Sequence, residues 1–218
     1  MNAKKELQAW LDELSNFKTP DFDALPDIDL YMDQVITYME RQLKVFMKDE
    51  EDKIITSSMI NNYVKGNVIP SPISKKYSNK HLAYIITVCS LKQILPIIDV
   101  SKLLNTNESF DDFYKFFKES QDQTINRTCS DVKKSLTGVK KEFEDDELRL
   151  LALKLTIEAN TYKNISERIL YILEQKRLEE IEELRKKTTK EEKKQSADSK
   201  KKVEKTNTET IVEENIEA

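Results

Sequence analysis

Residues 56–80 decide how this chain is expected to fold, and they read TSSMINNYVKGNVIPSPISKKYSNK. Thr56 is a typical N-cap residue, because its hydroxyl can accept a hydrogen bond from a free amide in the first turn of a helix. We therefore expect a short helix over 57–65. Gly66 is expected to end that helix in left-handed backbone, which glycine adopts without a steric cost at Cβ.

The segment 68–77 is expected to be neither helix nor regular sheet. Pro70 and Pro72 lack the amide hydrogen that both structures use, so a short ribbon or an extended arm is predicted. Ser78 then caps a strongly apolar helix. Pro96 is expected to end that helix and to begin the next one.

In the rest of the chain, apolar residues recur at spacings of three and four, which is typical of amphipathic helices. This spacing predicts helices over 2–17, 28–47, 78–95, 97–104, 128–136 and 147–187, and one that starts near Glu108. Two glycines and five prolines are too few for the turns of an all-β chain. The expected fold class is all-α, with Cys89, Cys129 and Tyr63 buried in the core.

The charge is unevenly distributed along the chain. The net charge is −4, and charged residues make up 35% of the sequence. Residues 1–52 hold 6 basic and 13 acidic residues, whereas 54–104 hold 6 lysines and a single acid, Asp99. A locally basic segment inside an acidic protein is a typical electrostatic footprint for nucleic acid.

We interpret the helix over 57–65 as the second helix of a helix-turn-helix, which would lie in the major groove of DNA. Its short polar residues would face the bases, and an asparagine amide offers adenine a donor and an acceptor together. Lysines would contact phosphates, and Ser78 at a helix N-terminus would hold another. Tyr77 would either pack as the hinge of the arm or reach the sugar-phosphate backbone. The candidate DNA-binding residues are Ser57, Ser58, Asn61, Asn62, Lys65, Lys75, Lys76, Tyr77, Ser78 and Lys80.

Simpler interpretations stand beside these. Asn61 and Asn62 could form an ordinary polar helix face, and the lysines an ordinary solvated surface. His81, the only histidine, is expected to be a surface residue or to have its hydrogen bonds satisfied. No phosphate loop, nucleophile elbow or zinc-ligand spacing occurs, so we expect no enzyme activity, metal or cofactor. The lack of a signal sequence and of a long apolar run predicts a cytoplasmic protein without a membrane span.

The run from Tyr63 to Pro70, followed by Lys75-Lys76-Tyr77-Ser78 and an apolar helix, resembles the winged helix-turn-helix of the MerR regulator superfamily. The chain departs from that pattern at Asn61, where arginine is usual, and at Asn67, where glycine is usual. Residues 26–35 and 59–65 more closely resemble a bacterial family of unknown function, number 1836 among such domains. The resemblance covers about residues 5–105 and implies a MerR-like DNA-binding fold.

Three regions are therefore expected: a MerR-like helix-turn-helix domain over 1–105, a helical effector or dimerisation region over 106–187, and a disordered charged tail over 188–218. The expected function is a transcription regulator that binds double-stranded DNA, with a possible homodimer. The stretch 147–184 would supply the dimer contact or would be a core helix of the monomer. An effector would be held near the aromatic residues 110–117, which could equally be core. The alternative function is a helical protein-interaction module without DNA binding.

Overall fold

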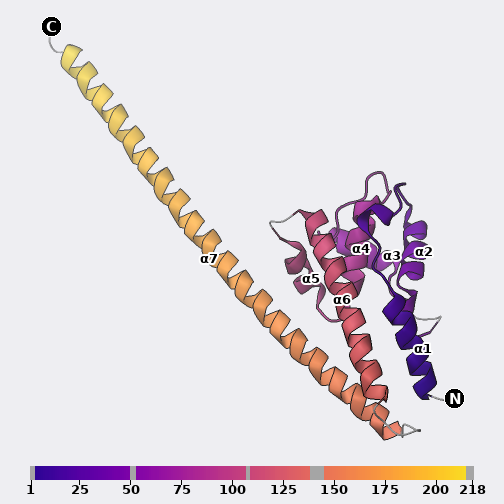
Figure 1. Cartoon of the computed structure of the whole chain (residues 1–218). Coiled ribbons are helices and arrows are strands. Elements are labelled where there is room, and N and C mark those ends of the chain that lie inside the picture. The colour runs from indigo at the N-terminus through magenta and orange to yellow at the C-terminus, as the bar shows by residue number, and fades with distance from the viewer. Residues whose placement is uncertain (1–2, 50–52, 107–108, 138–144, 215–218) are drawn as a thin grey trace. The chain divides into compact units, whose positions relative to one another are not determined.

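The computed structural model describes residues 3–49, 53–106, 109–137 and 145–214, with side chains described up to Thr188. The helices in chain order are α1 (Ala3–Asn16), α2 (Met32–Gln42), α3 (Ser57–Lys65), α4 (Asn79–Lys92), α5 (Ile97–Leu104), α6 (Phe110–Thr137) and α7 (Asp145–Glu214), with short 3-10 turns η1 (Phe22–Ala24) and η2 (Lys44–Phe46). Among the described residues there is no β-strand, so the predicted all-α fold class is confirmed (Figure 1).

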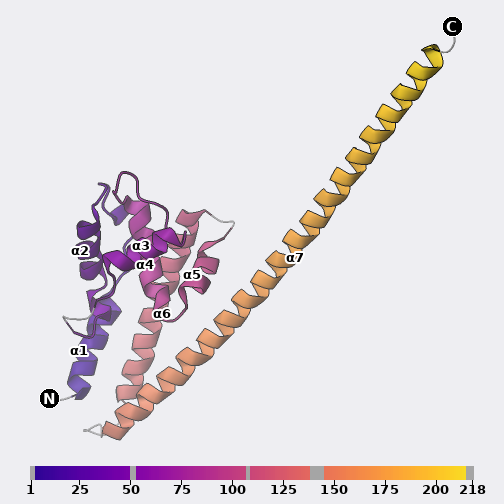
Figure 2. The ribbon, with the colours of Figure 1, turned by 180° about the vertical axis from the view of Figure 1, so that it is seen from behind.

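The chain divides into two compact units, residues 1–167 and 168–218. Within the first, α6 packs against α1, α4 and η1, and α1 runs alongside α6 in both views (Figures 1 and 2). The contacts thus place α6 with the N-terminal helices, and the domain boundary predicted at residue 105 stays a prediction. Of the predicted disordered tail over 188–218, residues 189–218 lie outside those whose side chains are described, and the backbone of α7 continues to Glu214.

The central helix of the first unit is α4. Apolar side chains cover almost its whole circumference, and Leu82, Ile85 and Ile86 are fully buried. Val35 of α2 and Ile60 of α3 are also fully buried. Because each of these buried side chains contributes about 1.5–3 kcal/mol on removal from water, this core is the main source of stability.

A smaller apolar cluster joins α1, α6 and the start of α7. Leu11, Cys129 and Leu136 are buried there, and Leu148 and Leu151 of α7 pack on them. The predicted burial of both cysteines is confirmed.

The linker after α1 is fixed to α6 by polar contacts. The buried amide of Thr19 donates a hydrogen bond to Oδ1 of Asp122 at 3.0 Å. The hydroxyl of Tyr114 donates to the carbonyl oxygen of Pro20 at 3.0 Å. Lys118 forms an ion pair of 3.0 Å with Asp21. These contacts hold η1 and α2 at a defined position relative to α6.

Several predicted helix boundaries were wrong. The helix predicted over 28–47 is shorter, because Leu30 pairs with Tyr77 and the chain passes from α2 into η2 after Leu43. The separate helix predicted over 128–136 is the second half of α6. Exposed polar residues in the middle of α6, such as Asn126, do not break the helix, since no proline or glycine interrupts 110–137.

Candidate nucleic-acid interface

Helix α3 has the predicted bounds and the predicted cap. The hydroxyl of Thr56 accepts a hydrogen bond from the amide of Met59 at 3.3 Å. Ile60 and Tyr63 are buried against the core, as predicted for Tyr63. The packing of these two residues determines which face of α3 is turned to solvent.

Five of the candidate residues share that solvent face, and all five are exposed: Ser57, Ser58, Asn61, Asn62 and Lys65. At the pitch of an α-helix they fall within an arc of about 140°. No acidic residue occurs in α3, so the face carries hydrogen-bonding groups and a single positive charge. Such a face can offer hydrogen bonds to base edges without repelling phosphates.

The turn after α3 differs from expectation in its backbone. Gly66 has a φ of −81°, and Asn67 adopts the left-handed region with a φ of 54°. The prediction of left-handed backbone at Gly66 was therefore wrong by one residue. Asparagine tolerates this region better than most residues. Glycine at 66 is favoured instead by space, because a Cβ there would lie 3.3 Å from the carbonyl oxygen of Asn62.

The predicted ribbon is a small hairpin, which we call the wing (residues 68–78). Ile73 and Lys76 exchange backbone hydrogen bonds of 3.1 and 2.9 Å. Between them, Ser74 and Lys75 have φ values of 51° and 64°. Two successive positive φ values are the signature of a type I′ turn. Lys75 therefore lies at the tip of the wing, and it is exposed.

The base of the wing is tied to the core. Tyr77 pairs with Leu30 and is 3% exposed, with its ring edge-on to that of His81 at 5.6 Å. Of the two roles considered for Tyr77, this position matches packing as the hinge of the arm. His81 has its hydrogen bonds satisfied, because Nδ1 accepts from the amide of Ser78 and Nε2 lies 3.2 Å from the carbonyl oxygen of Ser71.

The hydroxyl of Ser78 lies 2.9 Å from Nδ1 of His81 and is thus used within the cap of α4. Lys76 extends over the ring of Tyr31, 5.4 Å from its centroid. Lys80 lies 6.0 Å from the ring centroid of Phe110 on α6. Cation–π contacts of this kind hold an exposed ammonium group without neutralising its charge.

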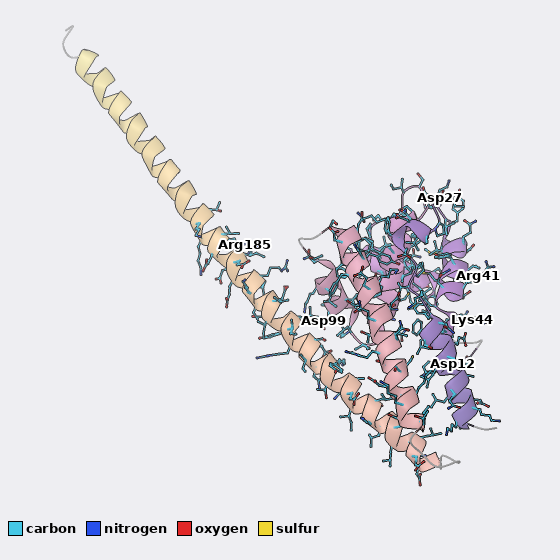
Figure 3. All side chains as sticks on the ribbon, viewed as in Figure 1. Asp12, Asp27, Arg41, Lys44, Asp99 and Arg185 are labelled. Carbon is cyan, nitrogen blue, oxygen red and sulfur yellow. The ribbon has the colours of Figure 1, made fainter. Side chains whose placement is uncertain are left out.

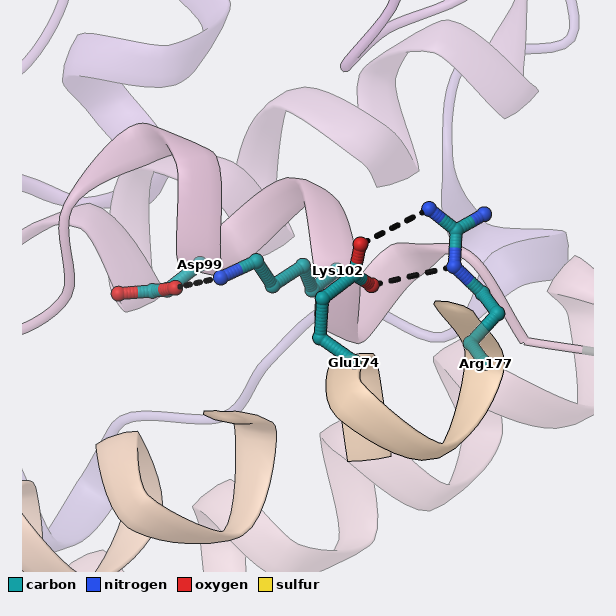
Figure 4. A network of polar contacts seen from close by, with 4 residues as sticks. All are labelled: Asp99, Lys102, Glu174 and Arg177. Atoms are coloured by element: carbon teal, nitrogen blue, oxygen red, sulfur yellow. Dashed lines mark hydrogen bonds and ion pairs between the residues drawn. The ribbon is translucent and has the colours of Figure 1, made fainter. Parts of the chain in front are cut away.

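Ion pairing distinguishes Lys102 from the other lysines of the basic segment. Among the described residues, no carboxylate forms an ion pair with Lys65, Lys75, Lys76 or Lys80. Lys102, by contrast, is paired with Asp99 at 2.8 Å within α5, as Arg177 is with Glu174 within α7 (Figure 4). Residues 50–52 of the acidic loop 49–52 lie outside the described residues.

A second surface lies between α1, α2 and η2. Trp10 is 43% exposed, and its indole nitrogen donates to the carbonyl oxygen of Val45 at 3.1 Å. The indole forms part of an open cleft of about 520 Å³, which Glu13, Arg41 and Lys44 also line. Arg41 and Lys44 extend from this side of the fold (Figure 3). Sequence reasoning missed this cleft, because its residues come from three elements whose packing has no local signal.

The region predicted as an effector site is partly core. Tyr114 and Phe117 are buried, whereas Phe116 is 70% exposed. In the described part of the chain, no cluster of histidine, cysteine or acidic side chains could hold a metal ion. None of the described helices combines the length and the apolar character that crossing a membrane requires.

Comparison with known families gives one result. Residues 20–122 match the model of a domain of unknown function, DUF1836. This match supports the predicted relation to that family of unknown function. No curated protein and no solved structure matches the chain.

The boundaries of the DUF1836 match fall at residues that join the linker after α1 to α6. It begins at Pro20, whose carbonyl oxygen accepts from Tyr114, and ends at Asp122, which binds the amide of Thr19. The DUF1836 region thus contains α2 to α5, the wing, and the part of α6 that closes the main core. Helix α1 and helix α7 lie outside it.

Proposed function

We propose that this chain binds double-stranded DNA through α3 and the wing, as a transcription regulator with a MerR-like winged helix-turn-helix. The observation that supports this most is the face of α3. Its five exposed polar residues carry no acid, and the adjacent wing presents Lys75 at its tip. In this arrangement α3 contacts base edges and the lysines contact phosphates.

The charges define how the binding should depend on salt. Each phosphate neutralised by a lysine adds about 0.9 to the slope of log affinity against log salt concentration. Binding through Lys65, Lys75, Lys76 and Lys80 would therefore weaken steeply as salt rises. The acidic residues elsewhere in the chain would limit binding to this face.

The test uses the full chain and fragments of the source genome, selected by binding at low salt. Retained fragments are then measured by filter binding over a salt series. We expect tight binding to some fragments and a steep salt slope. Retention of no fragment even at low ionic strength would refute the proposal.

Two variants and a matched control separate the roles of the residues. Lys75→Glu with Lys76→Glu should weaken binding to all fragments to a similar degree, whereas Asn61→Ala should change which fragments are preferred. Lys92→Glu is the matched control, because Lys92 is an exposed lysine of the same basic segment at the far end of α4. Equal effects of all three variants would contradict the assignment of base contacts to Asn61 and of phosphate contacts to Lys75 and Lys76.

We also propose that the regulator is a homodimer through α7. Leu148, Leu151 and Leu155 pack inside the first unit, while Leu150, Leu153 and Ile157 on the other side of the helix are 55–65% exposed. This second stripe has the three-and-four spacing of a helix–helix seam. Leu153→Glu should convert a dimer into a monomer in analytical ultracentrifugation, whereas Lys154→Glu beside the seam should not.

The alternative function, a protein-interaction module, is favoured by the cleft at Trp10. Its mixed charges and exposed indole fit a protein segment better than they fit a polyanion. Under this alternative, Trp10→Ala abolishes capture of a partner while Lys75→Glu with Lys76→Glu leaves it unchanged. DNA binding by the full chain that is lost with the lysine variant favours the first proposal.

A further inference from the structure

A cleft of about 340 Å³ lies where the end of α3, the start of the wing, α4 and α5 meet. Its floor includes Val68 and Ile69, which are 6% and 1% exposed. The volume falls at the lower end of the range of small-molecule sites, which is about 300–1,000 Å³. The position and the size of the cleft thus suit a small ligand.

The polar groups in this cleft are all uncharged. Among the lining residues, Tyr84 and Ser101 carry hydroxyls, and Asn67 and Asn105 carry amides. In the part of the chain that the structure describes, none of these four side chains makes a hydrogen bond. The cleft therefore offers several unused donors and acceptors above an apolar floor.

The wall formed by Tyr84 is supported from α6 by a ring stack. Its ring stacks on Phe110 of α6 with 3.6 Å between centroids and 8° between planes. Burial, with a smaller effect from the Asp111 carboxylate, raises the pKa of the Tyr84 hydroxyl. The hydroxyl is therefore a neutral hydrogen-bond donor and acceptor throughout the physiological pH range.

The composition of the lining decides between ligand classes. No charged side chain lines the cleft, so an ionised ligand would lose hydration without a compensating partner. An asparagine amide presents a donor and an acceptor side by side, which complements the edge of a nucleobase. A flat heterocycle would also use the apolar floor.

We propose that this cleft binds an uncharged heterocycle with adjacent hydrogen-bond donors and acceptors, such as the base of a nucleoside. Binding itself does not depend on the proposed DNA-binding function. The cleft nevertheless includes Gly66 and Asn67, directly after α3, so a ligand would contact the backbone that positions both α3 and the wing.

The experiment uses the full chain and isothermal titration calorimetry with adenosine, uridine and adenosine monophosphate. At least one neutral nucleoside should bind, and the monophosphate should bind at least tenfold more weakly than adenosine. Failure of both nucleosides to bind at millimolar concentration, or equal binding of the monophosphate, would overturn the proposal.

Three variants locate the site. Tyr84→Phe removes only the hydroxyl and keeps the stack on Phe110, and Ser101→Ala removes the second hydroxyl. Each should weaken nucleoside binding at least fivefold. Ser135→Ala, at an exposed serine of α6 outside the cleft, should bind as the unaltered chain does. Unchanged affinity in both cleft variants, with the fold intact by circular dichroism, would place the ligand elsewhere and refute the assignment.

Discussion

Leu30 and Tyr77 exchange two backbone hydrogen bonds, of 2.9 and 2.8 Å, and so join the segment before α2 to the base of the wing. Both side chains are buried, at 8% and 3% exposure. The amides of these two residues should therefore share one level of protection in hydrogen exchange. The amides of Ser74 and Lys75 at the tip of the wing should exchange much faster, and equal rates at all four positions would contradict the hairpin.

The tip of the wing allows a test that separates stability from binding. Lys75 occupies left-handed backbone, which costs a residue with a Cβ about 1 kcal/mol relative to glycine. Lys75→Gly should raise the unfolding temperature and, under the proposed function, weaken DNA binding at low salt. Lys75→Ala is the control, since it removes the same charge without relieving the backbone. A lower unfolding temperature in the glycine variant would contradict the left-handed backbone assigned to Lys75 in this turn.

At Tyr63, removing a polar group from the core is not expected to lower the free energy of unfolding. Its hydroxyl is buried without a hydrogen-bond partner among the described residues, and burial raises its pKa to about 12. An unsatisfied buried hydroxyl costs about 1–3 kcal/mol, so Tyr63→Phe should leave the free energy of unfolding unchanged or increase it. Denaturation in urea measures this. A loss of more than 1 kcal/mol would reveal a partner for the hydroxyl.

Asp122 is expected to be important for stability. Replacing it by alanine leaves the buried amide of Thr19 without its acceptor, which should cost about 1–3 kcal/mol. Asp131→Ala is the matched control on the same helix, because Asp131 forms only an exposed ion pair of 3.4 Å with Lys134. Such a pair contributes less than about 1 kcal/mol. Similar losses in both variants would contradict the assigned role of Asp122.

The thiol of Cys89 gives a pH-dependent prediction. Burial raises its pKa from 9.0 to about 12, so the folded state binds the thiol proton more tightly than the unfolded state does. This contribution to stability is complete below pH 9 and is lost as the pH rises toward 12. Cys89 should resist alkylation at pH 8 in the folded chain and react after unfolding in urea. Rapid alkylation of the native protein would show that the core opens readily.

Local signals in the sequence predicted α3 and its cap well. Thr56 and Gly66 lie at the two ends of α3, and the apolar residues Ile60 and Tyr63 mark its buried face. The start of α2 was mispredicted because Leu30 pairs with a residue far along the chain, and no periodicity reveals such a pairing. The continuity of α6 was missed because its polar middle, including Asn126, resembles a loop.

The candidate site was likewise predicted only where local sequence signals determine it. The exposed face of α3 could be predicted from helical spacing alone, since five polar residues lie on one side of the helix. The two clefts could not be predicted, because packing alone brings Trp10 to Val45 and places Asn67 and the end of α5 around one cleft. The role of Ser78 within the α4 cap also depends on its contact with His81.

Trp10 is the only tryptophan of the chain, and its indole is fixed to Val45 by one hydrogen bond. Its intrinsic fluorescence is therefore a reporter of a single event, the docking of α1 on η2. A red shift of the emission maximum on mild heating, before the loss of helical signal, would show that the N-terminal helix detaches first. A spectroscopic probe of this kind requires no added label.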